Sequence, residues 1–272
     1  RPGERASGGG ALSEPKPALG RRRAGLALVL GLVALWQAAS TFGWASAYLL
    51  PSPARVARAV VLAAASGELG RHVAASGLRV IEGFGLAATL ALPAAVLASF
   101  APALMAALNP LLTFLRNIPP LALVPLLILW FGIGEASKIA IIVLASFFPV
   151  FMGAVTGLAG VDPRLIEMGR SVGLSRARIL ARIMLPESVP SVANGLRLGL
   201  GYSWRALVGA EMVAASSGLG YWVLDAEQMA RIDVVLAGIL TIGALGILID
   251  RGALALASRL LPWARLEARW SA

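Results

Sequence analysis

Six long apolar segments constrain this chain of 272 residues more than any other feature of its sequence. Each is close to the ~20 residues that a helix needs to cross a hydrocarbon layer ~30 Å thick, and a helix satisfies its own backbone hydrogen bonds in lipid. With 58% apolar and only 14% charged residues, the chain could not hide this surface in a water-soluble fold of its size. The sequence therefore predicts an all-α polytopic membrane protein with about six transmembrane helices. The apolar segments cover residues 24–43, 73–100, 111–131, 139–159, 189–215 and 234–249.

The distribution of basic residues predicts the orientation of the chain. A net charge of +10 would suggest a nucleic-acid partner in a soluble protein, whereas in a membrane protein basic loops mark the cytoplasmic side. If six spans place both termini on one side, that side carries 15 Lys and Arg residues and the opposite side carries five. We therefore expect cytoplasmic termini and no nucleic-acid binding. The predicted domains are a flexible basic tail over 1–23, a transmembrane domain over 24–259 and a cytoplasmic tail over 260–272.

The longest predicted cytoplasmic loop, residues 160–188, has the start and stop signals of two short helices. Asp162 followed by proline is typical of a helix start, and Gly173 stands where a helix commonly ends in the left-handed conformation. Ser175 can cap a second helix. Pro186 is expected to end it, because proline lacks the amide hydrogen and its ring clashes with the preceding turn. The sequence predicts a rigid, arginine-rich helix-turn-helix on the membrane surface rather than a flexible tether.

One motif within this loop resembles the EAA loop of ATP-binding cassette importer permeases, in which Glu-Ala-Ala is followed at fixed intervals by Gly, Ile and Leu-Pro. Met168 and Gly169 replace the two alanines here, and every interval matches. The resemblance implies that the loop docks into a groove of an ATPase subunit and transmits its movement. The alternative, judged from the residues alone, is a surface helix that binds anionic lipid through its arginines. The coupling residues are Glu167, Met168, Gly169, Arg170, Gly173, Ile183, Leu185 and Pro186.

Two further segments, residues 115–134 and 204–221, resemble the branch of that family that moves nitrate, taurine, alkanesulfonates and related small anions. The first contains Arg-Asn-Ile-Pro-Pro and Trp-Phe-Gly-Ile-Gly, and the second contains Trp-Arg-Ala-Leu-Val and Ala-Glu-Met. The resemblance implies the type I importer permease fold in the lipid bilayer of a bacterial inner membrane. It also implies a second permease copy, two ATPase subunits and an extracytoplasmic solute-binding protein, which work by alternating access.

The sequence lacks the residues of an ATP site. A phosphate-binding Walker loop needs a lysine preceded by glycine, and the two lysines, Lys16 and Lys138, follow proline and serine. We therefore expect no cofactor and no catalytic residue in this chain, with ATP and Mg²⁺ on the separate ATPase. A single histidine, His72, and the lack of cysteine argue against a multi-histidine or thiolate metal site and against a Ser-His hydrolase. The lone histidine is expected to be an interfacial polar residue near the second span.

Charged residues inside the predicted spans are costly, so they are functional hypotheses by default. On the second span, Arg79 and Glu82 lie three residues apart and are expected to pair. On the fifth span, a spacing of ~100° per residue places four polar residues on one face. Two interpretations stay open for this face: an anion path that includes Arg205, or an ion pair in which an arginine neutralises the glutamate. The four residues are Asn194, Arg197, Arg205 and Glu211.

The prolines of the third span predict a break. Pro119 and Pro120 remove backbone donors, and together with Pro125 they are candidate gate residues. Arg116 is expected to extend its charge to the inner interface. The sequence thus predicts the permease subunit of an ATP-driven importer for a small anionic solute such as a sulfonate, taurine or nitrate. The alternative is a self-contained secondary transporter in which Glu211 relays protons, although the two halves show no internal repeat.

Overall fold

The computed structural model describes residues 18–44, 46 and 48–263, and every regular element in these ranges is helical. This confirms the predicted all-α fold. The elements are α1 (Ala18–Thr41), α2 (Pro53–Ala65), α3 (Glu68–Phe100), α4 (Pro102–Asn117), the 3₁₀ turn η1 (Pro120–Leu123), α5 (Val124–Phe131), α6 (Glu135–Ala159), α7 (Pro163–Ser171), α8 (Arg176–Ile179), the π-helix η2 (Leu180–Met184), α9 (Leu185–Ala214), α10 (Leu219–Gln228) and α11 (Ile232–Leu260).

The chain divides into two units, residues 1–56 and 57–272. In the first unit, α1 is long and apolar enough to span a membrane, and the indole N–H of Trp36 donates to the carbonyl oxygen of Pro51 at 3.0 Å. Residues 1–17 of the expected N-terminal tail lie outside the described residues, whereas residues 18–23 belong to α1. At the other end α11 reaches Leu260, and residues 264–272 of the expected C-terminal tail also lie outside the described residues.

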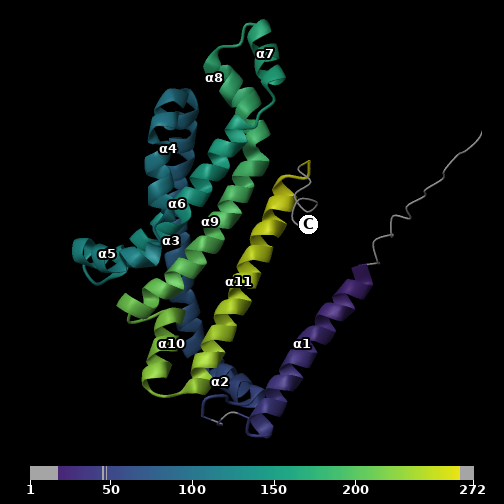
Figure 1. Ribbon diagram of the computed structural model, residues 1–272, viewed down its shortest axis with the longest axis vertical. Helices are drawn as coiled ribbons and strands as arrows, with labels where there is room; N and C mark the ends of the chain where they lie inside the picture. Colours follow the sequence, from purple (N-terminus) through teal and green to yellow (C-terminus); the bar gives the residue numbers. More distant parts are fainter. Residues whose placement is uncertain (1–17, 45, 47, 264–272) are drawn as a thin grey trace, which may run out of the picture. The chain divides into compact units, whose positions relative to one another are not determined.

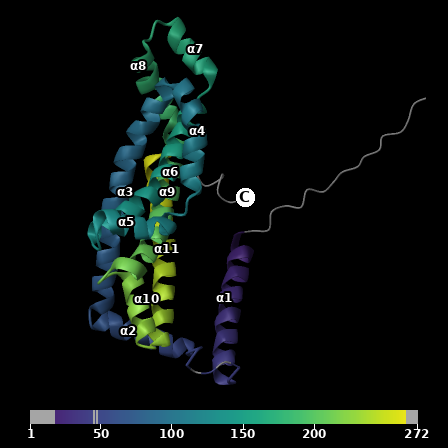
Figure 2. The same ribbon diagram turned by 60° about the vertical axis from the view of Figure 1, so that its left-hand side comes forward.

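The second unit is built around three long helices, α3, α6 and α9, which lie side by side (Figures 1 and 2). Small residues let them approach closely, which is how helices gain packing energy in an apolar solvent. On α3, Ala87, Ala91 and Ala95 are fully buried at a spacing of four residues. Between α6 and α9, a Cβ atom on Gly153 would lie 2.5 Å from the Cα atom of Gly195. The two backbones are therefore in direct contact at this point.

The third apolar segment is broken, as its prolines predict. Helix α4 ends at Asn117, Pro119 is extended, and Pro120 begins the turn η1. Helix α5 then carries Pro125 in its first turn, where a missing amide hydrogen costs nothing. The axis bends by 83° between α4 and the segment Pro120–Phe131. The bend places α5 across the bundle rather than along it (Figure 1).

Four described helices, α1, α3, α6 and α11, are long and apolar enough to cross a membrane, and the bent pair is a possible fifth crossing. The remaining apolar segment of the sequence forms α9, which has 30 residues and is long enough to cross. Helix α9 is less hydropathic than these four helices, because polar and charged residues such as Asn194, Arg197 and Arg205 interrupt its apolar surface. Its packing against α6 and α3 supplies the contacts that lipid would otherwise have to make.

The second unit has two distinct ends. The α7–α8 hairpin lies at one end, beyond the tips of α6 and α9 (Figures 1 and 2). Helix α10 lies at the opposite end and packs against α9 and α11. The functional features described below occupy these two ends and the level of the bend between them.

Candidate functional site

The cytoplasmic loop predicted from the sequence forms the α7–α8 hairpin. A side-chain oxygen of Asp162 accepts a hydrogen bond from the backbone N–H of Arg164 at 2.9 Å, which caps α7 as expected. Gly173 ends the first helix with φ +77°, a conformation that favours glycine. The hydroxyl of Ser175 accepts from the N–H of Arg178 at 3.4 Å and caps α8. These three sequence predictions are confirmed.

The two limbs of the hairpin are packed against each other through Gly169. This glycine is buried, and a Cβ atom on it would lie 2.8 Å from Cδ1 of Ile183 and 3.2 Å from Cγ1 of Ile179. Met168 and Val172 point outward instead, with 57% and 70% of their surfaces exposed. The hairpin therefore presents apolar side chains to the outside from a closed, rigid turn.

The expectation that Pro186 ends the second helix is wrong. The chain passes from α8 through the π-helical turn η2 into α9, where Pro186 occupies the first turn. In η2 the hydrogen bonds span five residues, as from the N–H of Leu185 to the carbonyl oxygen of Leu180. The wider π turn accommodates a residue that has no amide hydrogen. The loop is consequently continuous with α9, and Arg176–Ala214 forms one helical rod.

A buried ion cluster at the α10 end was not predicted. Arg79 on α3 donates from Nη1 to an oxygen of Glu211 at 2.7 Å, and from Nε and Nη2 to both oxygens of Glu135 at 2.6 and 2.8 Å. Lys138 also binds Glu135, at 2.7 Å. Arg79 is 5% exposed, Lys138 2% and Glu211 0%. The Glu135 side chain, in contrast, is 58% exposed, so the cluster extends from the interior of the bundle to its surface. Two cations and two carboxylates neutralise one another, which allows the three buried members to carry charge.

Glu211 is held by more than the ion pair. Its carboxylate accepts hydrogen bonds from the Ser76 hydroxyl at 2.9 Å and from the backbone N–H of Gly220 at 3.0 Å. Gly218, with φ +116°, leaves room for it, since a Cβ atom there would lie 2.2 Å from Oε1 of Glu211. The cluster thus joins α3, α6, α9 and the loop into α10. These contacts immobilise the carboxylate.

Two expected pairings are corrected by this cluster. Arg79 does not pair with Glu82, because Arg79 faces the bundle interior whereas Glu82 is exposed on the outside of α3. The counter-ion of Glu211 is Arg79 rather than an arginine of its own helix. Lone His72 lies beside the cluster: its Nδ1 atom accepts from the N–H of Gly218 at 3.1 Å.

The four polar residues expected to share one face of α9 have different surroundings and different contacts. Arg197 forms a two-pronged ion pair with Asp250 on α11, with both contacts at 2.7 Å. Arg205 is exposed; its Nε donates to Gly201 in its own helix, and its guanidinium carbon lies 4.7 Å from the centre of the Tyr202 ring. Glu211 belongs to the buried cluster described above. The Oδ1 atom of Asn194 is buried and has no hydrogen-bond partner among the described residues.

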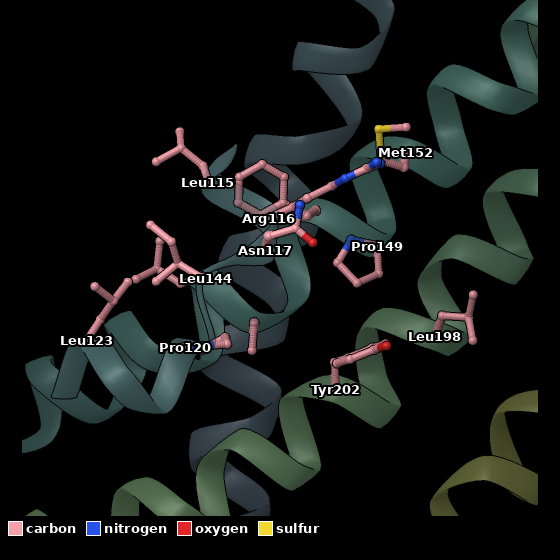
Figure 3. Close-up of a pocket in the computed structure, with 13 residues that line it drawn as sticks. Leu115, Arg116, Asn117, Pro120, Leu123, Leu144, Pro149, Met152, Leu198 and Tyr202 are labelled. Carbon is pink, nitrogen blue, oxygen red and sulfur yellow. The ribbon is translucent and has the colours of Figure 1, made fainter. Parts of the chain in front are cut away.

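A cavity of about 560 Å³ opens at the break between α4 and α5. Figure 3 shows Arg116 and Asn117 from the end of α4, Pro149 from α6 and Tyr202 from α9 gathered around it. Arg116 therefore lines a cavity at the break between α4 and α5. The other lining residues are apolar: Leu115, Ile118, Pro120, Leu123, Leu144, Ala145, Phe148, Met152 and Leu198.

Comparisons with known proteins agree with this arrangement. Residues 87–262 match the family described as "Binding-protein-dependent transport system inner membrane component". The chain is 38% identical to the taurine transport system permease protein of Escherichia coli, over 85% of this chain and 86% of that protein. It is 39% identical to a protein of the same bacterium provisionally named as an aliphatic sulfonates transport permease, over 87% of this chain and 90% of that protein.

A solved structure has the same fold at low sequence identity. The matching chain belongs to the MetNI methionine ABC transporter, determined in an inward-facing conformation, and has a TM-score of 0.60 at 18% identity. The match covers 68% of this chain and 92% of that chain. The predicted type I importer permease fold is thereby confirmed.

Proposed function

Because the chain belongs to the family of binding-protein-dependent transport system inner membrane components, we propose that it forms the membrane path of an importer for a small anionic solute of the sulfonate class. Membership makes it a non-catalytic, multi-pass subunit of the inner membrane. An ATPase subunit hydrolyses ATP, and a solute-binding protein completes the importer. The proposal concerns the solute, the pairing of two identical permease copies, the orientation and the residues that act.

The observation that carries the proposal is the rigid connection between the hairpin and the bundle. Arg176–Ala214 is one helical rod, and α7 is closed onto its start through Gly169. A displacement of the hairpin by an ATPase would therefore move α9 rather than bend a linker. The docking residues in this proposal are the eight predicted ones: Glu167, Met168, Gly169, Arg170, Gly173, Ile183, Leu185 and Pro186.

The solute class is supported by the relatives and by charge. Both E. coli relatives are named for compounds that carry a sulfonate group. Arg205 is exposed on α9, where it stacks on Tyr202, so a positive charge is available at the surface of a central helix. Arg197 lies on the same helix, but its charge is neutralised by Asp250, and this ion pair joins α9 to α11.

Alternating access needs an element that can change its angle. The bent segment carries Pro119, Pro120 and Pro125, and broken helices in transporters commonly line the path. We assign these prolines to a gate. The α7–α8 hairpin and both termini lie on the cytoplasmic side in this proposal, and α10 lies on the outer side. The transmembrane domain is then 24–259, with cytoplasmic tails at 1–23 and 260–272.

The proposed function is tested with the complete importer in proteoliposomes. The permease, its ATPase and its solute-binding protein are reconstituted together, and uptake of labelled taurine and ethanesulfonate is measured with ATP. We expect ATP-dependent uptake of a sulfonate that persists when a protonophore collapses the proton gradient. Native mass measurement is expected to show two permease and two ATPase copies. Uptake that needs the proton gradient and not ATP would establish a secondary transporter instead.

Coupling through the hairpin is tested with Gly173→Asp. A side chain at φ +77° is strained and displaces the turn between α7 and α8, so ATP should no longer drive uptake although the complex assembles. Gly67→Asp is the matched control, because Gly67 has φ +76° and equally open surroundings but lies outside the hairpin. Normal transport by Gly173→Asp would contradict the coupling role.

A further inference from the structure

The four arginines that the sequence places inside predicted spans fall into two pairs, one bound to carboxylates and one not. Arg79, Lys138 and Arg197 each contact a carboxylate within 2.7 Å. Arg116 and Arg205 form no salt bridge with any residue that the structure describes. A charge within a membrane bundle is stable only if it faces other polar groups or a water-filled path. Neither side chain is neutralised by a carboxylate of the described residues, so each is available to a negatively charged partner.

Arg116 lies well inside the length of the bundle. Helix α4 starts directly after α3 at the α7–α8 end and has 16 residues. The rise from its first residue, Pro102, to Arg116 is about 21 Å at 1.5 Å per residue. The bend follows at once, and α5 leaves sideways at an intermediate level of α6 and α9 (Figures 1 and 2). Arg116 is thus placed at an intermediate level of the bundle and not at its α7–α8 end.

The cavity at this level has the chemistry of an anion site. Arg116 and the amide of Asn117 line one side, and Tyr202 lines another. Arg205 lines a separate cavity with Arg197 and Asp250, and it reaches the present one only through its stacking on the Tyr202 ring. The cavity has no acidic lining residue. Guanidinium groups bind the oxygens of an anionic head in pairs, and the volume of about 560 Å³ falls within the usual range for small ligands. The remaining wall is apolar and suits a short hydrocarbon tail.

We propose that this cavity is a transient anion-binding site within the translocation path. Arg116 contacts the anionic head of the solute, and Tyr202, on which Arg205 stacks, lines the facing wall on α9. The inference deepens the proposed function and rests on it for the identity of the solute, a small organic sulfonate. The competing role for Arg116 is structural: a cation in the last turn of α4 complements the partial negative charge of the helix end.

The first arm of the test reads the local charge without transport. The sequence contains no cysteine, so Leu198→Cys introduces a single thiol into the cavity wall, and Met229→Cys places one on an exposed site outside it. Each purified importer is reacted with an anionic and a cationic methanethiosulfonate reagent. We expect the anionic-to-cationic rate ratio to be about tenfold higher at position 198 than at 229. Adding Arg116→Gln should abolish that difference. An unchanged ratio in Arg116→Gln would overturn the proposal.

The second arm measures ethanesulfonate uptake by reconstituted importers. Arg116→Gln should lower uptake at least tenfold, while ATP hydrolysis stimulated by the binding protein stays within twofold of wild type. Arg116→Lys keeps the helix-end charge but loses the paired contact, so it should assemble like wild type and recover uptake only in part. Arg251→Gln, an exposed arginine of α11 outside this cavity, is the matched control. Loss of assembly in Arg116→Gln with full uptake in Arg116→Lys would establish the structural role and overturn the proposal.

The two arms separate this proposal from the proposed function. If the wild-type importer takes up no sulfonate with ATP, the proposed function fails in its solute class. The thiol rates still report whether the cavity concentrates anions. If wild-type uptake is normal and Arg116→Gln transports equally well, only the present proposal fails.

Discussion

At the scale of single residues, the strongest interactions join positions that are far apart in the sequence. Arg79 binds Glu135 and Glu211, which lie 56 and 132 residues away. The burial of such an ion pair determines how much it contributes to the free energy of unfolding. Removing one member of a buried pair leaves an uncompensated charge and costs about 3–5 kcal/mol, whereas an exposed pair contributes about 0–1 kcal/mol.

The buried cluster yields the first prediction. Glu211→Gln keeps the shape of the side chain but removes the negative charge that faces the Nη1 atom of Arg79 at 2.7 Å. With Glu211 fully buried, we expect a loss of about 3–5 kcal/mol, seen as a large drop in the melting temperature of the detergent-purified protein. Glu82→Gln, on the exposed side of the same helix as Arg79, should leave the melting temperature unchanged. Equal melting temperatures for Glu211→Gln and wild type would contradict this role.

The pair between Arg197 and Asp250 yields a smaller expected effect. Half of the Asp250 side chain is exposed, at 51%, so solvent already stabilises its charge. Asp250→Asn should therefore cost about 1 kcal/mol or less. A double-mutant cycle with Arg197→Gln, followed by thermal unfolding, measures the coupling. A coupling energy as large as that of the buried cluster would show that the exposure of an ion pair does not determine its contribution to stability in this bundle.

At the scale of elements, local signals in the sequence were reliable where the interaction is local. Asp162, Ser175 and Gly173 predicted the ends of the hairpin helices, since each acts on its own backbone within a few residues. Pro119 and Pro120 predicted the break for the same reason. Pro186 was misread, because its effect depends on whether the preceding turn can widen into a π-helix, which no single residue determines.

The faces of helices were predicted less well than their ends. The 100° periodicity places Arg197, Arg205 and Glu211 on one side of α9. Arg197 nevertheless binds Asp250 of α11, Glu211 binds Arg79 of α3, and Arg205 stacks on Tyr202 of α9 itself. The sequence shows on which face of its own helix a side chain lies, but it does not show which other helix packs against that face. The cavity at the α4–α5 break was missed for this reason, although the intramembrane arginine beside two prolines was the signal that could have indicated it.

The packing of the hairpin predicts how tightly position 169 is constrained. Gly169→Ala brings a methyl group within 2.8 Å of the terminal carbon of Ile183, a flexible atom that can move, so transport should stay within about twofold of wild type. Gly169→Leu cannot be accommodated between Ile179 and Ile183 and should force the limbs apart. We expect it to abolish ATP-driven uptake while the complex still inserts. The measurement is uptake per assembled complex, and full activity of the leucine variant would show that hairpin closure is unnecessary.

At the scale of the whole molecule, the basic residues are distributed unequally between the two ends of the second unit, and this bears on its orientation in the membrane. The hairpin end carries five arginines between residues 160 and 188, whereas the loop between α10 and α11 carries Arg231 alone. Cytoplasmic loops hold an excess of basic residues, and this supports the proposed orientation with the hairpin inside and the α10 end outside. An ATPase on the cytoplasmic side and a binding protein on the outer side then each meet a different end of the second unit.

This orientation can be tested because the sequence contains no cysteine. Met229→Cys places a thiol on an exposed position after α10, and Ala177→Cys places one on the exposed surface of the hairpin. In intact spheroplasts, an impermeant maleimide should label position 229 and not 177, whereas inverted membrane vesicles should give the opposite result. Each thiol serves as the control for the other, since both must react after detergent is added. Labelling of position 177 from outside would reverse the orientation, and with it the assignment of the hairpin to the ATPase.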